Sequence, residues 1–197
     1  MDIDPQDLLE QAQGTGARRT ARLNAVVAVT VALLATFMGI CKVKDDNIVQ
    51  AMQQAQADKL DHWNFYQARN LRQELAEVAA DQLSLAQAQA ADKAAYDAPI
   101  RRYRDLAAEQ ARKKAELRAQ AEEDQRQYDR LNYRDDQFDL SDTLLAIAIA
   151  MLAVTALTGL WAMYWAAAVP TFFGLLMGVA GLAALPIHPD ALVRLLS

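Results

Sequence analysis

The sequence predicts an all-α integral membrane protein with three transmembrane helices and a long extramembrane helical hairpin that resembles a coiled coil. The chain has 197 residues, 53% apolar and 23% charged, yet no Asp, Glu, Lys or Arg occurs in residues 23–41 or 143–189. Apolar runs of this length without charge are typical of membrane spans. Between them, residues 42–141 contain no glycine and a single proline, as expected of long helices.

The first apolar run, residues 23–41, predicts transmembrane helix 1, preceded by a polar N-terminal arm over residues 1–22. At about 1.5 Å per residue this helix spans about 28 Å, close to the hydrocarbon thickness of a bilayer. The run exceeds the roughly 7–15 apolar residues of a signal peptide, so we interpret it as an uncleaved anchor. In the arm, a short helix is expected to start at Pro5 and to end at residues 14–16. The arginines expected at the membrane interface are Arg18, Arg19 and Arg22.

Residues 42–141 predict the hairpin domain. Pro99 disfavours helical geometry at the preceding residue and lacks a backbone donor, so the turn is expected near residues 97–100. The arms then cover about residues 45–96 and 100–138. A heptad spacing runs along the first arm and a 3-4 alternation along the second. The predicted hairpin seam consists of Trp63, Tyr66, Leu71, Leu75, Val78, Leu85, Leu117, Tyr128 and Leu131.

This seam is diluted by alanine and polar residues, so an isolated hairpin would be only marginally stable. We therefore expect the hairpin to pack against copies of itself or against another protein. The aromatic group at residues 62–66 is interpreted as part of the seam rather than as a ligand-binding patch.

The second charge-free run is too long for one crossing and predicts transmembrane helices 2 and 3, over residues 142–167 and 170–188. Pro170 is expected at the turn between them, and residues 189–197 form an interfacial tail. The aromatic residues expected at the membrane interface are Trp161, Tyr164 and Trp165. Gly174 and Gly178 have GxxxG spacing, and together with Gly181 they predict a helix-packing face.

Composition and motifs argue against several classes of function. One cysteine and two histidines give neither a disulfide framework nor a zinc site, and a net charge of −5 provides no basic surface for nucleic acid. No GxSxG, Walker, HExxH or GxGxxG motif occurs. The paired carboxylates of residues 42–141 are explained as solvated helix faces with i,i+4 partners. We therefore expect no catalytic residue, no metal and no cofactor, and a protein that is not an enzyme.

Two segments carry a resemblance to a known family. Residues 63–73, WNFYQARNLRQ, resemble the W-x-F-Y-Q-A-K/R-x-x-R-Q signature of a bacterial membrane family, domain of unknown function 4337. Residues 137–142, QFDLSD, are similar to that family's approach to its second membrane helix. The resemblance covers the chain from about residue 20 and implies the order anchor, hairpin, two closing membrane helices. Members carry basic residues between the last two helices, whereas residues 166–171 have none. The family has no assigned activity, so the resemblance implies an architecture and no reaction.

These observations lead to a functional expectation: a non-enzymatic structural or scaffolding membrane protein that self-assembles through the hairpin and the glycine-containing helix. The alternative is an accessory or adaptor subunit of a larger membrane complex, such as a transporter or an energy-transducing enzyme. The expected partners are the lipid bilayer, copies of the chain and other membrane subunits. The expected location is the bacterial inner membrane, with the N-terminus and the 166–171 turn in the cytoplasm and the hairpin and C-terminus in the periplasm, because three arginines precede the first span and two lysines follow it.

Overall fold

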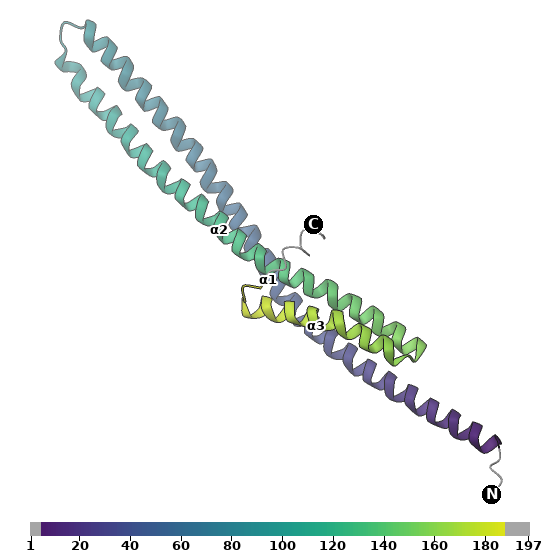
Figure 1. The fold of residues 1–197 in the computed structure, drawn as a ribbon. Coiled ribbons are helices and arrows are strands. Elements are labelled where there is room, and N and C mark those ends of the chain that lie inside the picture. The colour runs from purple at the N-terminus through teal and green to yellow at the C-terminus, as the bar shows by residue number, and fades with distance from the viewer. Residues whose placement is uncertain (1–4, 188–197) are drawn as a thin grey trace. The chain divides into compact units, whose positions relative to one another are not determined.

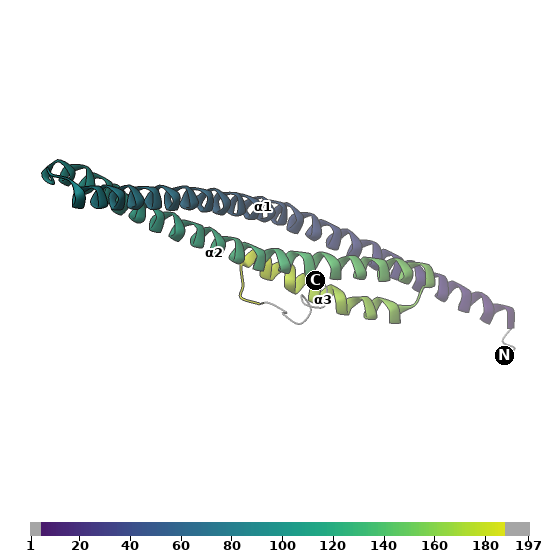
Figure 2. The same ribbon diagram turned by 90° about the horizontal axis from the view of Figure 1, so that it is seen from above.

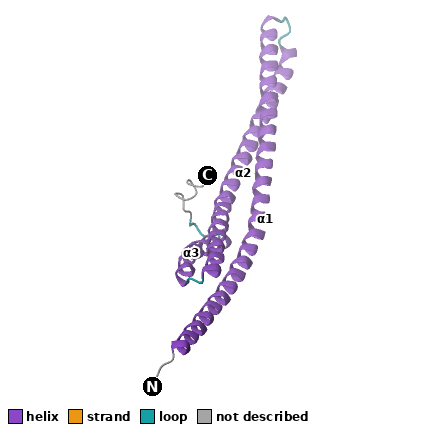
Figure 3. Ribbon diagram, turned by 90° about the vertical axis from the view of Figure 1, so that its right-hand side faces the viewer, coloured by secondary structure: helices purple, strands orange, loops and turns teal. Residues whose placement is uncertain are grey.

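The chain folds into three helices in a computed structural model that describes residues 5–187, with side chains from residue 18 onward. These helices are α1 (Pro5–Gln89), α2 (Ala94–Thr158) and α3 (Trp161–Ala183) (Figure 1). No strand occurs between residues 5 and 187, as the colouring of Figure 3 makes plain. Each helix contains a segment long and apolar enough to cross a membrane, so the all-α class and the three apolar segments are confirmed.

The described residues form two compact units. Residues 50–131 make up the hairpin unit, in which the second half of α1 and the first half of α2 run antiparallel (Figure 1). Residues 5–49 and 132–187 make up the other unit, which holds the three apolar segments, and Figure 2 shows α3 beside the end of α2. Its core takes side chains from all three helices: Leu23, Val27, Leu34, Leu145, Ala148, Leu152 and Ala167.

The start of the chain differs from the prediction. No break occurs at residues 14–16, and α1 runs without interruption from Pro5 through the first apolar run and into the hairpin. A glycine inside a helix costs only about 1 kcal/mol relative to alanine, and neither proline nor a capping motif follows to stop the helix. Two isolated glycines are therefore a weak termination signal.

The hairpin turn lies at residues 90–93 instead of 97–100. The Asp92 carboxylate accepts a hydrogen bond from the Ala94 backbone N–H at 3.1 Å, which satisfies a donor at the start of α2. Across the turn, the Gln87 side-chain amide donates to the Lys93 carbonyl oxygen and to the Asp97 carboxylate, at 2.8 and 2.7 Å. Pro99 lies in the second turn of α2. The helix therefore continues through the proline and gives up one backbone hydrogen bond there.

The connection between the last two helices is also earlier than predicted. α2 ends at Thr158 and α3 begins at Trp161, so Pro170 lies inside α3 and the boundaries 142–167 and 170–188 do not hold. Gly159 has φ +68°, a left-handed conformation that ends helices and that glycine adopts without strain. A proline removes one backbone hydrogen bond from the helix, a loss that apolar membrane helices tolerate.

α3 ends well before residue 188. Ala184 adopts the left-handed conformation (φ 53°, ψ 42°), and its backbone N–H reaches the carbonyl oxygens of Ala180 and Gly181. This arrangement closes the C-terminus of the helix in the usual way. The predicted interfacial tail, residues 189–197, lies outside the described residues.

Candidate functional site

The glycines of α3 lie in the packing between the three apolar segments. A Cβ atom added to Gly174 would stand 2.8 Å from the Leu145 side chain of α2. One added to Gly178 would stand 2.6 Å from Phe37 of α1 and 2.7 Å from Ser141 Oγ of α2. The Ser141 hydroxyl also donates a hydrogen bond to the Gly174 carbonyl oxygen at 2.8 Å. The glycine face is therefore a contact within one chain, where only a hydrogen atom fits at each α-carbon.

Two side chains of α2 bind the end of α3. The Arg134 guanidinium donates to the Gly181 carbonyl oxygen from Nη2 at 2.9 Å, and so places a positive charge where the helix dipole is negative. The Gln137 side chain is fully buried, and its Nε2 donates to the carbonyl oxygens of Leu185 and Ile187 at 2.9 and 2.6 Å. These bonds hold the segment that follows α3 against α2, and the Leu185 carbonyl oxygen also accepts a hydrogen bond from the Ile187 backbone N–H at 2.8 Å.

The aromatic residues expected at the interface lie in the first two turns of α3. The Tyr164 ring makes edge-to-face contacts with Trp161 and Trp165, at centroid distances of 5.9 and 5.8 Å. Its hydroxyl lies 3.2 Å from Thr30 Oγ1 of α1, whereas Trp165 is 67% exposed. The three arginines before the first apolar run, Arg18, Arg19 and Arg22, are exposed.

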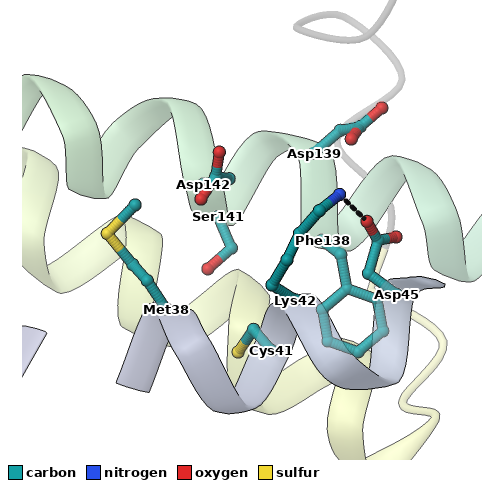
Figure 4. A pocket seen from close by; sticks show the side chains of 8 residues that line it. All are labelled: Met38, Cys41, Lys42, Asp45, Phe138, Asp139, Ser141 and Asp142. Atoms are coloured by element: carbon teal, nitrogen blue, oxygen red, sulfur yellow. Dashed lines mark hydrogen bonds and ion pairs between the residues drawn. The ribbon is translucent and has the colours of Figure 1, made fainter. Parts of the chain in front are cut away.

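A small polar cavity lies between α1 and α2, at the end of the apolar segments that is closer in sequence to the hairpin (Figure 4). Its volume of about 20 Å³ has room for about one water molecule. Asp45 is only 4% exposed, and its Oδ2 accepts a hydrogen bond from Lys42 Nζ at 2.8 Å. The other oxygen, Oδ1, has no hydrogen-bond partner. The residues around the cavity are Met38, Cys41, Lys42, Asp45, Phe138, Asp139, Ser141 and Asp142.

The carboxylates at this cavity and that of Asp135, one turn before Asp139 on α2, perturb one another. Burial, together with a hydrogen bond to Asp45 and the charge of Asp139, raises the pKa of Asp135 to about 6 from an ordinary value of 3.8. Partial desolvation and the charge of Asp45 likewise raise the pKa of Asp139. For the basic partner, the hydrogen bond to Asp45 raises the pKa of Lys42, so this ammonium group stays charged. The cavity is therefore lined by one lysine, which is paired with Asp45, and by the three carboxylates of Asp45, Asp139 and Asp142.

The seam between the hairpin arms consists of small and polar side chains. Ala76 and Ala80 of α1 and Ala107 and Ala121 of α2 are buried there. Hydrogen bonds that cross the seam join Arg69 Nη1 to Gln110 Oε1 at 2.9 Å, Lys114 Nζ to Asn70 Oδ1 at 2.9 Å, and Lys59 to Gln125. On the second arm, Leu117, Tyr128 and Leu131 are half-buried at positions of the expected 3-4 alternation.

On the first arm, the register of the seam differs from the prediction. Five large aliphatic side chains point away from the second arm, and we call them the outer row: Leu60, Leu71, Leu75, Val78 and Leu85. Their exposed fractions are 56, 57, 61, 53 and 70%. Because alanines let the two arms approach closely, there is no space for leucines between them, and the heptad row faces outward. Leu71, Leu75, Val78 and Leu85 therefore do not belong to the seam within the chain.

The aromatic residues of the first arm are only partly covered. The Trp63 ring is 45% exposed and stacks on Tyr66 at a centroid distance of 5.0 Å. Tyr66 is half-buried, and Lys114 Nζ of the second arm lies 5.9 Å from its ring centroid. Close by, His62 Nδ1 lies 2.6 Å from Asp124 Oδ2, a pair that joins the two arms. Among the described residues, no three His, Cys, Asp or Glu side chains are grouped closely enough to hold a metal ion.

Comparison with known protein families gives a match over most of the chain. A family model described as a domain of unknown function (DUF4337) matches residues 23–184, which include all three apolar segments and the whole hairpin. The chain belongs to the DUF4337 family. Comparisons with curated proteins and with solved structures gave no match.

In this DUF4337 chain, both segments that carry the resemblance make contacts between helices. Residues 63–73 supply Arg69 and Asn70 to the hairpin seam, and residues 137–142 supply Gln137 and Ser141 to the contacts with α3. Sequence reasoning interpreted the paired carboxylates that include Asp45 and Asp135 as solvated helix faces, and it assigned no helix-packing role to Arg134 or Gln137. Their one signal was position, since Asp45 and residues 134–139 lie at the edges of the charge-free runs.

Proposed function

We propose that this DUF4337 protein is a non-enzymatic structural or scaffolding protein of the bacterial cytoplasmic membrane that assembles with copies of itself through the hairpin. The observation that supports the proposal is the outer row. Five large aliphatic side chains lie on one stripe of α1, each more than half exposed, and four of them fall within 15 residues. Contiguous apolar stripes of this kind are typical of association surfaces.

The spacing of the outer row favours a second helix as its partner. Leu71, Val78 and Leu85 are seven residues apart and Leu75 lies between them on the same side, which is the pattern that inserts into a facing helix of a coiled coil. A second copy presents the same stripe, so a two-fold contact buries both stripes at once. Some charged side chains of the hairpin, in contrast, form ion pairs along one helix, such as Lys113 with Glu109 and Arg118 with Glu122. Such pairs stabilise an exposed helix.

Polar substitution of the outer row tests the proposal. Leu71→Gln combined with Leu75→Gln is expected to weaken self-association of the detergent-purified protein roughly 1,000-fold, since four side chains of a two-fold dimer each lose about 1 kcal/mol of burial. Mass measurement over a range of protein concentrations reports the change.

The matched control is Leu106→Gln, because this leucine is 39% exposed on the other arm and lies outside the outer row. The control should associate like the parent. A parent protein that stays monomeric at all concentrations contradicts self-assembly, and if it copurifies with other membrane subunits, the adaptor function is favoured instead.

For orientation, we propose that the N-terminus is cytoplasmic and the hairpin periplasmic. Three exposed arginines precede the first apolar run, whereas Lys42 and Lys44 follow it, and the 159–160 connection carries no charge. A phosphatase that is active only in the periplasm should give signal when inserted at residues 90–93 and none when fused at the N-terminus. The reverse pattern of signal would invert the orientation.

A further inference from the structure

Asp45 is a buried carboxylate that is only half paired. Its side chain is 5% exposed, and one oxygen accepts the hydrogen bond from Lys42. The other oxygen, Oδ1, is buried and has no donor. An ionised oxygen removed from water needs a hydrogen-bond donor, so the arrangement is incomplete as long as all its neighbours are deprotonated acids.

Asp135 of α2 is placed to supply that donor. It is half-buried and lies one helical turn before Phe138 and Asp139, which line the same cavity as Asp45, and a hydrogen bond to Asp45 contributes to the raised pKa of Asp135. Two neighbouring carboxylates repel each other when both are ionised, whereas one shared proton removes the repulsion and creates a hydrogen bond. The proton comes from bulk solvent, and only an O–H bond forms.

We propose that Asp45 and Asp135 form a proton-binding site. When Asp135 takes up a proton, its O–H group donates a hydrogen bond to the unpaired oxygen of Asp45 and thereby joins α1 to α2 beside the apolar segments. This site is independent of the proposed self-assembly, because both residues belong to the unit that holds the apolar segments.

The surrounding groups favour uptake of the proton. Of the two nearest cations, Lys42 is engaged with Asp45 and Arg134 with the Gly181 carbonyl oxygen. α3 brings no charge, since residues 161–183 contain no Asp, Glu, Lys, Arg or His. The titratable or charged groups that face the site are Cys41 and Lys42 from α1, and Arg134, Asp136, Asp139 and Asp142 from α2, whereas Asp46 of α1 is exposed.

The expected pH dependence follows from the direction of the pKa shift. The folded chain binds the proton with a pKa of about 6, whereas the unfolded chain binds it with the ordinary value of 3.8. A group that is protonated more readily in the folded state stabilises it fully below the lower value, and this contribution is lost as the pH rises through the higher one. The unit that holds the apolar segments should therefore be more stable at about pH 5 than at about pH 7.5.

Infrared difference spectroscopy of the purified full chain tests the site directly, because a protonated carboxyl group has a C=O stretching band that a carboxylate lacks. Titration from about pH 7.5 to about pH 5 should reveal this band with a midpoint near 6. Asp135→Asn should abolish it. The same variant should also remove most of the rise in melting temperature on acidification, because its amide is a neutral donor at every pH.

Asp46→Asn is the matched control. This substitution also removes one carboxylate charge, next to Asp45 on the same helix, but the Asp46 side chain is 66% exposed. The control should keep both the band and the pH dependence of the parent. The proposal is overturned if the parent shows no band above about pH 5, or if the band survives in Asp135→Asn.

Discussion

Replacing both Gly174 and Gly178 with leucine is expected to destabilise the folded chain by about 2–6 kcal/mol, because overpacking a well-packed contact costs about 1–3 kcal/mol per site. The Cβ atom alone would already stand 2.8 Å from Leu145 at the first position and 2.6 Å from Phe37 at the second. Helix backbones must then move apart, and the hydrogen bond from Ser141 to the Gly174 carbonyl oxygen is lost. Thermal unfolding in detergent measures the effect.

Gly39 offers a matched control for this experiment. It lies in α1 within the first apolar run, and a Cβ atom added there would meet nothing within 4 Å. Gly39→Leu should therefore unfold at the same temperature as the parent or slightly above it, since leucine favours helices more than glycine does. A double variant that melts together with the control would show that the glycine face is not a tight contact.

Replacing Gln137 with leucine should cost about 1–3 kcal/mol, because the Ile187 carbonyl oxygen loses the side-chain amide as a donor and the Leu185 carbonyl oxygen keeps only the Ile187 backbone N–H. The side chain has no exposed surface, and its amide binds the Leu185 and Ile187 carbonyl oxygens, so the loss falls on the segment that leaves α3. Hydrogen exchange should accelerate at the end of α3 in addition to a lower melting temperature. Gln127→Leu, at an exposed position of the same helix, should leave both measurements unchanged. Equal protection at the end of α3 in the parent and Gln137→Leu would contradict the proposed role.

The helical class and the three apolar segments could be predicted from the sequence, because charge and glycine are distributed so unevenly along it. The turns could not be placed. Pro99 and Pro170 looked like the strongest breaks, but each is accommodated inside a helix. The turns in the structure depend on sequence signals that are weaker than proline. These are the Asp92 carboxylate, which accepts a hydrogen bond at the start of α2, and Gly159, which adopts a left-handed conformation. Proline removes one backbone hydrogen bond from a helix, whereas a capping residue stabilises the helix end.

The seam register failed for a different physical reason. A heptad of leucines predicts that some helix packs on them, but it does not say which one. In the hairpin, Ala80 lies near Ala107, and Ala76 and Ala121 are also buried, so small side chains make the contact between the arms and the larger ones of the first arm stay exposed. The carboxylates near the cavity were interpreted as solvated, because the sequence alone does not distinguish a buried charged residue from an exposed one. Only the fold reveals that Asp45 is buried and Asp46 is not.

The glycine face of α3 leaves little for the membrane part to contribute to assembly. The glycine face already packs closely against the other two apolar segments of the same chain. The other side of the helix presents bulky rings, with Phe172 61% and Phe173 50% exposed. Lipid tails solvate such rings as well as another protein helix would, so they give a neighbouring subunit no advantage over lipid. In the proposed assembly, lipid could therefore exchange freely around each subunit while the subunits stay together, and recognition between copies would take place in water.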